Sequence, residues 1–127
     1  MTEYTVKEET FSYLEVMKSK FTAFIIPTKD IDSFKQRLEE IRKANPKARH
    51  IVYAYRIGVN SKSTDDGEPK GTAGRPILEL LAKKNLNYVS LIVVRYYGGT
   101  QLGAGRLLRT YLNSAIEAIN KAEIIEL

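Results

Sequence analysis

Apolar residues recur with a period of two in some segments and of three to four in others, which predicts both strands and helices. Residues 50–59 show the strand pattern most clearly. Ile51, Tyr53, Tyr55 and Ile57 share one face, and Val52, Ala54 and Arg56 share the other. Further strands are predicted within residues 5–16, 21–26 and 88–97. The last is almost continuously apolar, so we expect it to be central and covered on both faces.

Three segments carry the spacing of an amphipathic helix: residues 30–43, 73–84 and 107–122. Asp30 or Thr28 is suited to cap the first helix, which Asn45 and Pro46 end. The third helix carries a predicted apolar stripe made of Leu108, Leu112, Ala115 and Ile119. Opening strands followed by alternating helices and strands predict an α/β (α+β) two-layer sandwich, with a mixed sheet covered by helices.

Length and composition fit one domain over residues 1–127, with 43% hydrophobic and 28% charged residues. The chain has no cysteine, which excludes disulfides, thiolate chemistry and zinc–cysteine sites. It opens without a basic segment followed by an apolar run, and its apolar stretches are too short to cross a bilayer. We therefore expect a cytoplasmic protein without a membrane partner.

Positive charge is concentrated in one part of the chain. The net charge is +5, and no aspartate or glutamate occurs from residue 80 to residue 116. The cations there are Lys83, Lys84, Arg95, Arg106 and Arg109. This distribution favours an anionic partner such as nucleic acid, and the alternative is a solvated basic face.

Seven of the eight glycines fall in two segments, residues 65–76 and 95–106. In the second segment, Gly98, Gly99, Gly103 and Gly105 lie between the apolar strand and the third helix. Backbone N–H groups at such a helix entry, with Arg95, Arg106 and Arg109, are suited to bind an anion. The spacing matches neither the dinucleotide fingerprint nor the Walker loop. The nearby tyrosines Tyr96, Tyr97 and Tyr111 are suited either to stack on bases or to pack in the core. The alternative to an anion site in this segment is a tight structural turn between the strand and the helix.

The first glycine-rich segment begins with an acidic cluster, Asp65, Asp66 and Glu68. These carboxylates are suited to hold Mg²⁺ or to act as an acid/base pair. The alternative is a structural turn in which Asp66 or Glu68 pairs with Arg95. The same segment continues with Lys70, Thr72 and Arg75, where the two cations suit an anion and the threonine caps a helix or binds that anion.

Histidine and serine give little support for a hydrolase. His50 is the only histidine, and a lone histidine at a strand start is more often structural than catalytic. Ser61, Ser63 and Ser90 lack the context of an activated nucleophile. The residues therefore predict no catalytic group outside the acidic cluster.

The two glycine-rich segments also carry a family resemblance. The chain resembles, over about residues 15–122, the N-terminal domain shared by bacterial YigZ proteins and eukaryotic IMPACT. The resembling segments are residues 19–24, 48–58, 65–78 and 94–105. Arg106 stands where the family usually has a further glycine, which adds charge at the helix entry and puts in doubt any contact that needs bare backbone there.

The resemblance implies a fold like the second domain of a small-subunit ribosomal protein, shared with elongation factor G domain IV and the RNase P protein, both RNA binders. It also implies a link to translation, because eukaryotic IMPACT restrains a kinase that controls initiation. Bacterial members usually carry a second, ferredoxin-like domain, so we expect a single-domain member or a fragment.

Two functions follow from these observations. The first is a non-enzymatic module that binds RNA, the ribosome or a translation-regulatory protein through both loops. The second is a metal-assisted enzyme on a phosphorylated or nucleotide substrate. In the second, the acidic cluster holds Mg²⁺, and Lys70, Arg95 and Arg106 hold the anion.

Overall fold

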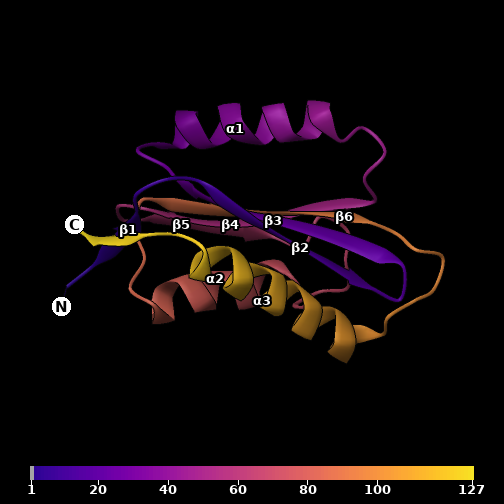
Figure 1. Cartoon of the computed structure of the whole chain (residues 1–127). Coiled ribbons are helices and arrows are strands. Elements are labelled where there is room, and N and C mark those ends of the chain that lie inside the picture. Colours follow the sequence, from indigo (N-terminus) through magenta and orange to yellow (C-terminus); the bar gives the residue numbers. More distant parts are fainter. Residues whose placement is uncertain (1) are drawn as a thin grey trace.

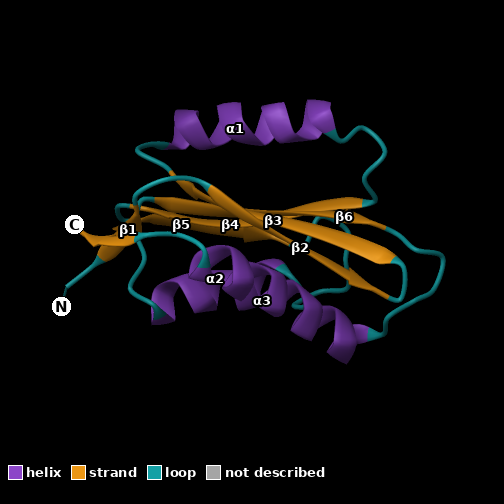
Figure 2. Ribbon diagram, in the orientation of Figure 1, coloured by secondary structure: helices purple, strands orange, loops and turns teal. Residues whose placement is uncertain are grey.

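A five-stranded sheet lies between one helix on one face and two helices on the other (Figures 1 and 2). The computed structural model describes residues 2–127, so Met1, the first residue of the expected domain, lies outside the described residues. The elements are β1 (Tyr4–Val6), β2 (Thr10–Val16), β3 (Ser19–Pro27), α1 (Ile31–Ala44), β4 (His50–Ile57), β5 (Asn60–Thr64), α2 (Gly74–Lys83), β6 (Val89–Tyr96), α3 (Ala104–Asn120) and β7 (Ile124–Glu126).

The strand order is β2-β3-β6-β4-β5, with every pairing antiparallel. β6 is the central strand, and its residues from Val89 to Arg95 are all buried, as its continuous apolar pattern predicted. The α+β class is confirmed. The structure refines it in two respects: the main sheet is antiparallel rather than mixed, and helices cover both faces. The cause is that the central strands are apolar on both sides, so both faces require cover.

Helix α1 covers one face of the sheet (Figure 2). Phe34, Leu38 and Ile41 of this helix pack on the face that carries Tyr53 and Tyr55 of β4. The Asp30 carboxylate accepts the Ser33 N–H at 2.8 Å, which caps the helix and lowers the pKa of Asp30. The alternation predicted for residues 50–59 is confirmed as far as Ile57, where β4 ends and a turn at residues 58–59 begins. Asp30 rather than Thr28 is the cap.

Helices α2 and α3 cover the opposite face, which carries Val52 and Ala54 of β4. On α3 the predicted apolar stripe is partly wrong. Ala115 and Ile119 are buried as expected, but Leu108 and Leu112 are only half-buried. The buried face turns instead toward Tyr111, whose ring packs edge-on against Phe21 at 5.2 Å between centroids. α3 also begins at Ala104 rather than residue 107, so Gly105 and Arg106 lie in its first turn.

Two strands have no clear signal in the sequence. β5 is polar along its length, because it lies at the edge of the sheet beside β4. β7 is exposed and pairs with β1, which brings the two ends of the chain together (Figure 1). Within residues 2–127, no helix combines the length and apolar character needed to cross a membrane.

Candidate functional site

The two glycine-rich segments meet at the end of the sheet that lies away from the chain termini (Figure 1). Strand register brings this about, because Arg95 of β6 pairs with His50 of β4 on one side and with Phe21 of β3 on the other. The first segment leads into α2 and the second leads into α3. The two glycine-rich segments therefore form one composite feature at this end of the sheet.

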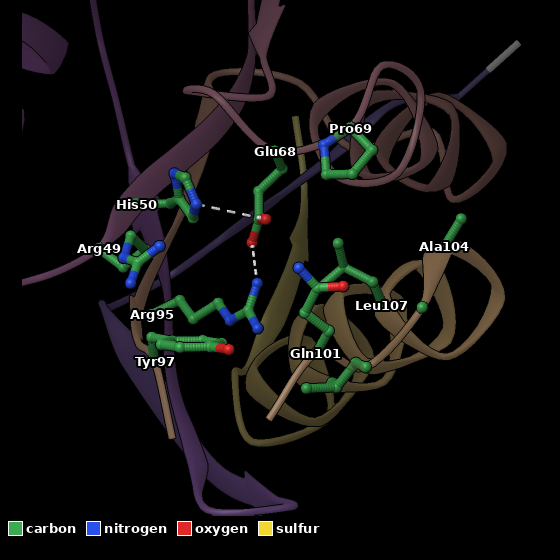
Figure 3. A pocket seen from close by; sticks show the side chains of 11 residues that line it. Arg49, His50, Glu68, Pro69, Arg95, Tyr97, Gln101, Ala104 and Leu107 are labelled. Atoms are coloured by element: carbon green, nitrogen blue, oxygen red, sulfur yellow. Dashed lines mark hydrogen bonds and ion pairs between the residues drawn. The ribbon is translucent and has the colours of Figure 1, made fainter. Parts of the chain in front are cut away.

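Glu68 is the centre of this feature (Figure 3). Its carboxylate is buried, and its Oε2 accepts from Arg95 Nη1 at 2.6 Å and from the Tyr111 hydroxyl at 2.5 Å. Its Oε1 lies 3.4 Å from His50 Nε2. One carboxylate from the first segment therefore holds groups from β4, β6 and α3.

Arg95 and Tyr111 are fixed by this carboxylate. Arg95 Nη2 also donates to the Ser19 hydroxyl at 3.3 Å, and that hydroxyl accepts the Gly98 N–H at 3.1 Å. Burial and the adjacent Glu68 carboxylate raise the pKa of Tyr111, so its phenol stays protonated. The structure shows Arg95 paired with Glu68, the pairing that the structural alternative expected. Its predicted role in binding an anion stays a prediction.

His50 links the start of β4 to the acidic cluster. Its Nδ1 lies 2.6 Å from the Asp66 carbonyl oxygen. A carbonyl oxygen can only accept, so Nδ1 carries the proton in this contact. The Asp66 carboxylate accepts the Ile51 N–H at 2.7 Å, which is a second hydrogen bond between the acidic loop and β4.

The three carboxylates of the acidic cluster diverge. Asp65 accepts the backbone N–H groups of Gly71, Ala73 and Gly74 at 2.9–3.1 Å, and so closes the entry to α2. Asp66 is bound to β4 and Glu68 to Arg95. In the described residues 2–127, no three His, Cys, Asp or Glu side chains are grouped to hold a metal ion. The predicted Mg²⁺ site would need these side chains to leave their present partners.

Two glycines allow backbone segments to touch. A Cβ at Gly98 would collide with the backbone of Lys18 and Ser19, and a Cβ at Gly74 would lie 2.5 Å from the Thr64 carbonyl oxygen. These contacts bring the second loop against the β2–β3 turn and α2 against β5. Gly103, with φ +81°, instead faces open space at the entry to α3.

A pocket of about 490 Å³ opens between the two segments (Figure 3). His50, Glu68 and Arg95 form its inner part, and Gln101, Leu102, Gly103, Ala104 and Leu107 form the wall next to α3. Arg49, Pro69 and Tyr97 complete the lining. The Arg49 guanidinium lies over the ring of the exposed Tyr97, 4.4 Å from its centroid.

The predicted anion-binding residues are distributed unevenly around this pocket. Arg95 and Gly103 line it, whereas the remainder lie outside its lining: Lys70, Arg75, Gly98, Gly99, Gly105, Arg106 and Arg109. Arg75 is exposed and pairs with Glu79, and Arg106 contacts Met17 of the β2–β3 turn. The Thr72 hydroxyl donates to the Pro69 carbonyl at 2.5 Å, so it is used within its own loop.

Three residues of the site were not singled out as site residues from the sequence: Ser19, Arg49 and Gln101. Ser19 and Arg49 lie in segments that carried the family resemblance, and Gln101 lies in the second glycine-rich segment, but only the fold brings them to the site. Arg49 directly precedes the lone histidine at the start of a predicted strand, which is the one indication that could have found it.

The fold and the site define a small α+β domain in which a buried carboxylate joins two glycine-rich loops around a pocket. A family model described as the Impact N-terminal domain matches residues 17–119. The chain belongs to this family, as its signature segments predicted.

Curated relatives extend beyond the length of this chain. It is 38% identical to the IMPACT family member YvyE of Bacillus subtilis, over 97% of this chain and 58% of the relative. It is 36% identical to YigZ of Escherichia coli, over 84% of this chain and 55% of the relative. The chain therefore spans somewhat more than half the length of these proteins.

Similar structures have been solved, and two of them place this fold among known proteins. A crystal structure of a hypothetical protein superposes with a TM-score of 0.94 and 30% identity, over 99% of this chain and 64% of that one. The two-domain translational regulator Yih1 superposes with a TM-score of 0.50 and 22% identity, over 91% of this chain and 46% of that one. The second likeness concerns the fold alone.

Proposed function

We propose that this chain is a non-enzymatic binding module of translation control that binds single-stranded RNA at the surface around the pocket. The observation that carries the proposal is the pairing of Arg49 with Tyr97 at the pocket. Both side chains are exposed, and together they offer a cation for a phosphate and an aromatic ring for a base.

The charges around this pair favour an anion. The pocket contains one carboxylate, Glu68, which Arg95 already neutralises. Beside the pocket, Lys18, Lys20, Tyr96, Tyr97 and Gly98 line a second hollow together with one acidic residue, Glu15. Basic side chains interleaved with aromatic rings are typical of proteins that bind single-stranded nucleic acid without sequence preference.

The link to translation rests on the relatives. Yih1, which shares the fold, is described as a translational regulator, and the family includes the IMPACT proteins. We extend that role to this chain as part of the proposal, with RNA or the ribosome as the partner.

Binding of an unstructured polyuridine RNA, followed by fluorescence anisotropy, tests the proposal. We expect Arg49→Ala and Tyr97→Ala each to weaken binding by about tenfold, the effect of losing one stacked base or one charged contact. Lys83→Ala is the matched control, because Lys83 is an exposed cation on the last turn of α2. No binding by the native chain, or equal losses in all three variants, would reject the proposal.

A protein partner is a second candidate, and a different surface favours it. Phe11 and Tyr13 are 58% and 50% exposed on β2, which is an edge strand of the sheet. An exposed edge with large apolar side chains is suited to pair with an extended segment of another protein. If this candidate holds, a partner captured from lysate by the native chain is lost with Phe11→Ser. Capture of the same proteins by both would count against it.

The metal-assisted enzyme stays a prediction without a comparable observation in its favour. Asp65, Asp66 and Glu68 each serve a different part of the fold. Calorimetric titration with Mg²⁺, in the presence and absence of nucleotide, is its direct test.

A further inference from the structure

We infer that the pocket between the two glycine-rich segments binds one nucleotide through its phosphate group. The inference deepens the proposed RNA-binding function and rests on it, because it names the part of the RNA that enters the pocket. It is carried by the size of the pocket, by the donors that line it and by the aromatic ring at its edge.

The pocket has the dimensions of a small-molecule site. Its volume of about 490 Å³ falls within the usual range of ligand pockets, roughly 300–1,000 Å³. A cavity of this size accommodates a single nucleotide. A longer strand would have to continue over the neighbouring surface, where Lys18 and Lys20 lie.

Arg95 supplies a donor that the protein itself leaves unused. Its side chain is 6% exposed and lines the pocket, with Nη1 held by Glu68 and Nη2 by Ser19. Its Nε is buried and has no hydrogen-bond partner among the described residues. A buried donor without an acceptor is costly, and an acceptor brought by a ligand would satisfy it once a shift of the guanidinium exposes Nε to the pocket.

The start of α3 adds donors to the same pocket. Gly103 and Ala104 line the pocket, and this helix has neither a side-chain cap at Gly103 nor an acidic residue in its first turn. The first backbone N–H groups of a helix lack acceptors within the helix, and the helix dipole places partial positive charge there. These groups favour a phosphate at the start of α3.

Tyr97 distinguishes a nucleotide from a bare anion. Its ring is 37% exposed and lines the same pocket. A phosphate held near α3 and Arg95 leaves the attached sugar and base on the side of the pocket where Tyr97 and Arg49 lie. Stacking on this pair would then add affinity beyond that of the phosphate alone.

Calorimetry with three probes tests the inference: adenosine monophosphate, inorganic phosphate and adenosine. We expect adenosine monophosphate to bind most tightly, inorganic phosphate to compete with it, and adenosine to bind at least tenfold more weakly. Equal affinity for adenosine and its monophosphate would overturn the inference, because the phosphate would then contribute nothing.

Variants locate the binding. Gln101→Glu places a negative charge in the pocket from an exposed position, so it should reduce binding of adenosine monophosphate by at least tenfold without unfolding the chain. Arg49→Ala should have a similar effect, and Lys83→Ala should have none. Binding that survives Gln101→Glu unchanged would place the nucleotide elsewhere and reject the inference.

The outcomes separate this inference from the function on which it rests. If polyuridine binds through Arg49 and Tyr97 while the mononucleotide and phosphate do not bind, RNA binding stands and the phosphate pocket is rejected. If the mononucleotide binds and polyuridine does not, the pocket is supported as a site for free nucleotide and the RNA function is rejected.

Discussion

Glu68 and Arg95 form a buried ion pair, with 2.6 Å between Oε2 and Nη1, that ties the first glycine-rich segment to the end of β6. The same carboxylate oxygen accepts from Tyr111 of α3. Glu68 thus joins segments that form the walls of the pocket.

Replacing Glu68 with glutamine is expected to destabilise the fold strongly. Glu68→Gln leaves the Arg95 guanidinium buried without its counter-charge, and loss of one partner of a buried ion pair costs about 3–5 kcal/mol. Chemical denaturation measures the change in the free energy of unfolding. Glu79→Gln is the matched control, because Glu79 pairs with Arg75 at 3.6 Å on the surface, where such pairs contribute about 1 kcal/mol or less. Equal losses in the two variants would contradict the structural role of Glu68.

Tyr111 is expected to make the fold sensitive to alkaline pH. Its pKa is raised in the folded chain, whereas in the unfolded chain it titrates near its ordinary value of about 10. The protonated Tyr111 phenol therefore contributes its full stabilisation of the folded chain below about pH 10. This contribution is lost as the pH rises above that value, because only the unfolded chain then releases the proton.

Tyr111→Phe separates this effect from other alkaline titrations. The variant keeps the ring against Phe21 and removes the hydroxyl, so it should cost about 1–3 kcal/mol at neutral pH. It should also lose less stability than the native chain when the pH is raised above about 10. Parallel pH profiles for the two proteins would show that the buried phenol is not the group responsible.

Alanine substitutions at two glycines of the second segment should change the stability of the fold in opposite directions. Gly98→Ala forces a Cβ into the backbone of the β2–β3 turn, at a cost of about 1–3 kcal/mol. Gly105→Ala lies in the first turn of α3, where its Cβ would meet only the far end of the Arg109 side chain at 3.5 Å. It should stabilise the chain by up to about 1 kcal/mol. Melting temperatures of both variants test the difference, and a loss in both would be the contrary result.

Asp65 is expected to act on the fold rather than on a metal. Asp65→Ala removes the acceptor of three backbone N–H groups at the entry to α2, which should cost about 2 kcal/mol. Because this role needs no ion, the loss should be the same with and without Mg²⁺ in thermal denaturation. Stabilisation by Mg²⁺ of the native chain but not of the variant would instead favour the metal-assisted enzyme.

Periodicity predicted most of the fold, because the central elements bury continuous or regularly spaced apolar residues. β4, β6 and α1 lie where their patterns place them. Periodicity did not predict β5, because this strand is polar and lies at an edge of the sheet. It also did not predict which face of α3 is buried, because that depends on the packing of Tyr111 against Phe21. Antiparallel pairing depends on contacts between distant segments, which local patterns do not contain.

The candidate site was predictable in outline. Clustered glycines identified both segments, and charge identified Glu68 and Arg95, although their pairing was one of several alternatives. Arg49 and Gln101 lie in segments that the sequence singled out, but their own roles were not predicted, because single polar residues become part of a site only when the fold brings them to one pocket. The sequence also predicted site residues that the fold does not place at the pocket. Lys70, Arg75 and Arg109 are close to the glycines in sequence but lie outside the pocket lining.

The salt dependence of polyuridine affinity tests RNA binding at this surface most directly. The logarithm of the association constant should fall linearly with the logarithm of salt concentration, because each phosphate contact releases counterions. Arg49→Ala should reduce the magnitude of that slope by about 0.7, the contribution of one contact to a single strand, and Lys83→Ala should leave it unchanged. A slope that is the same in the native chain and in Arg49→Ala would contradict RNA binding through this pocket.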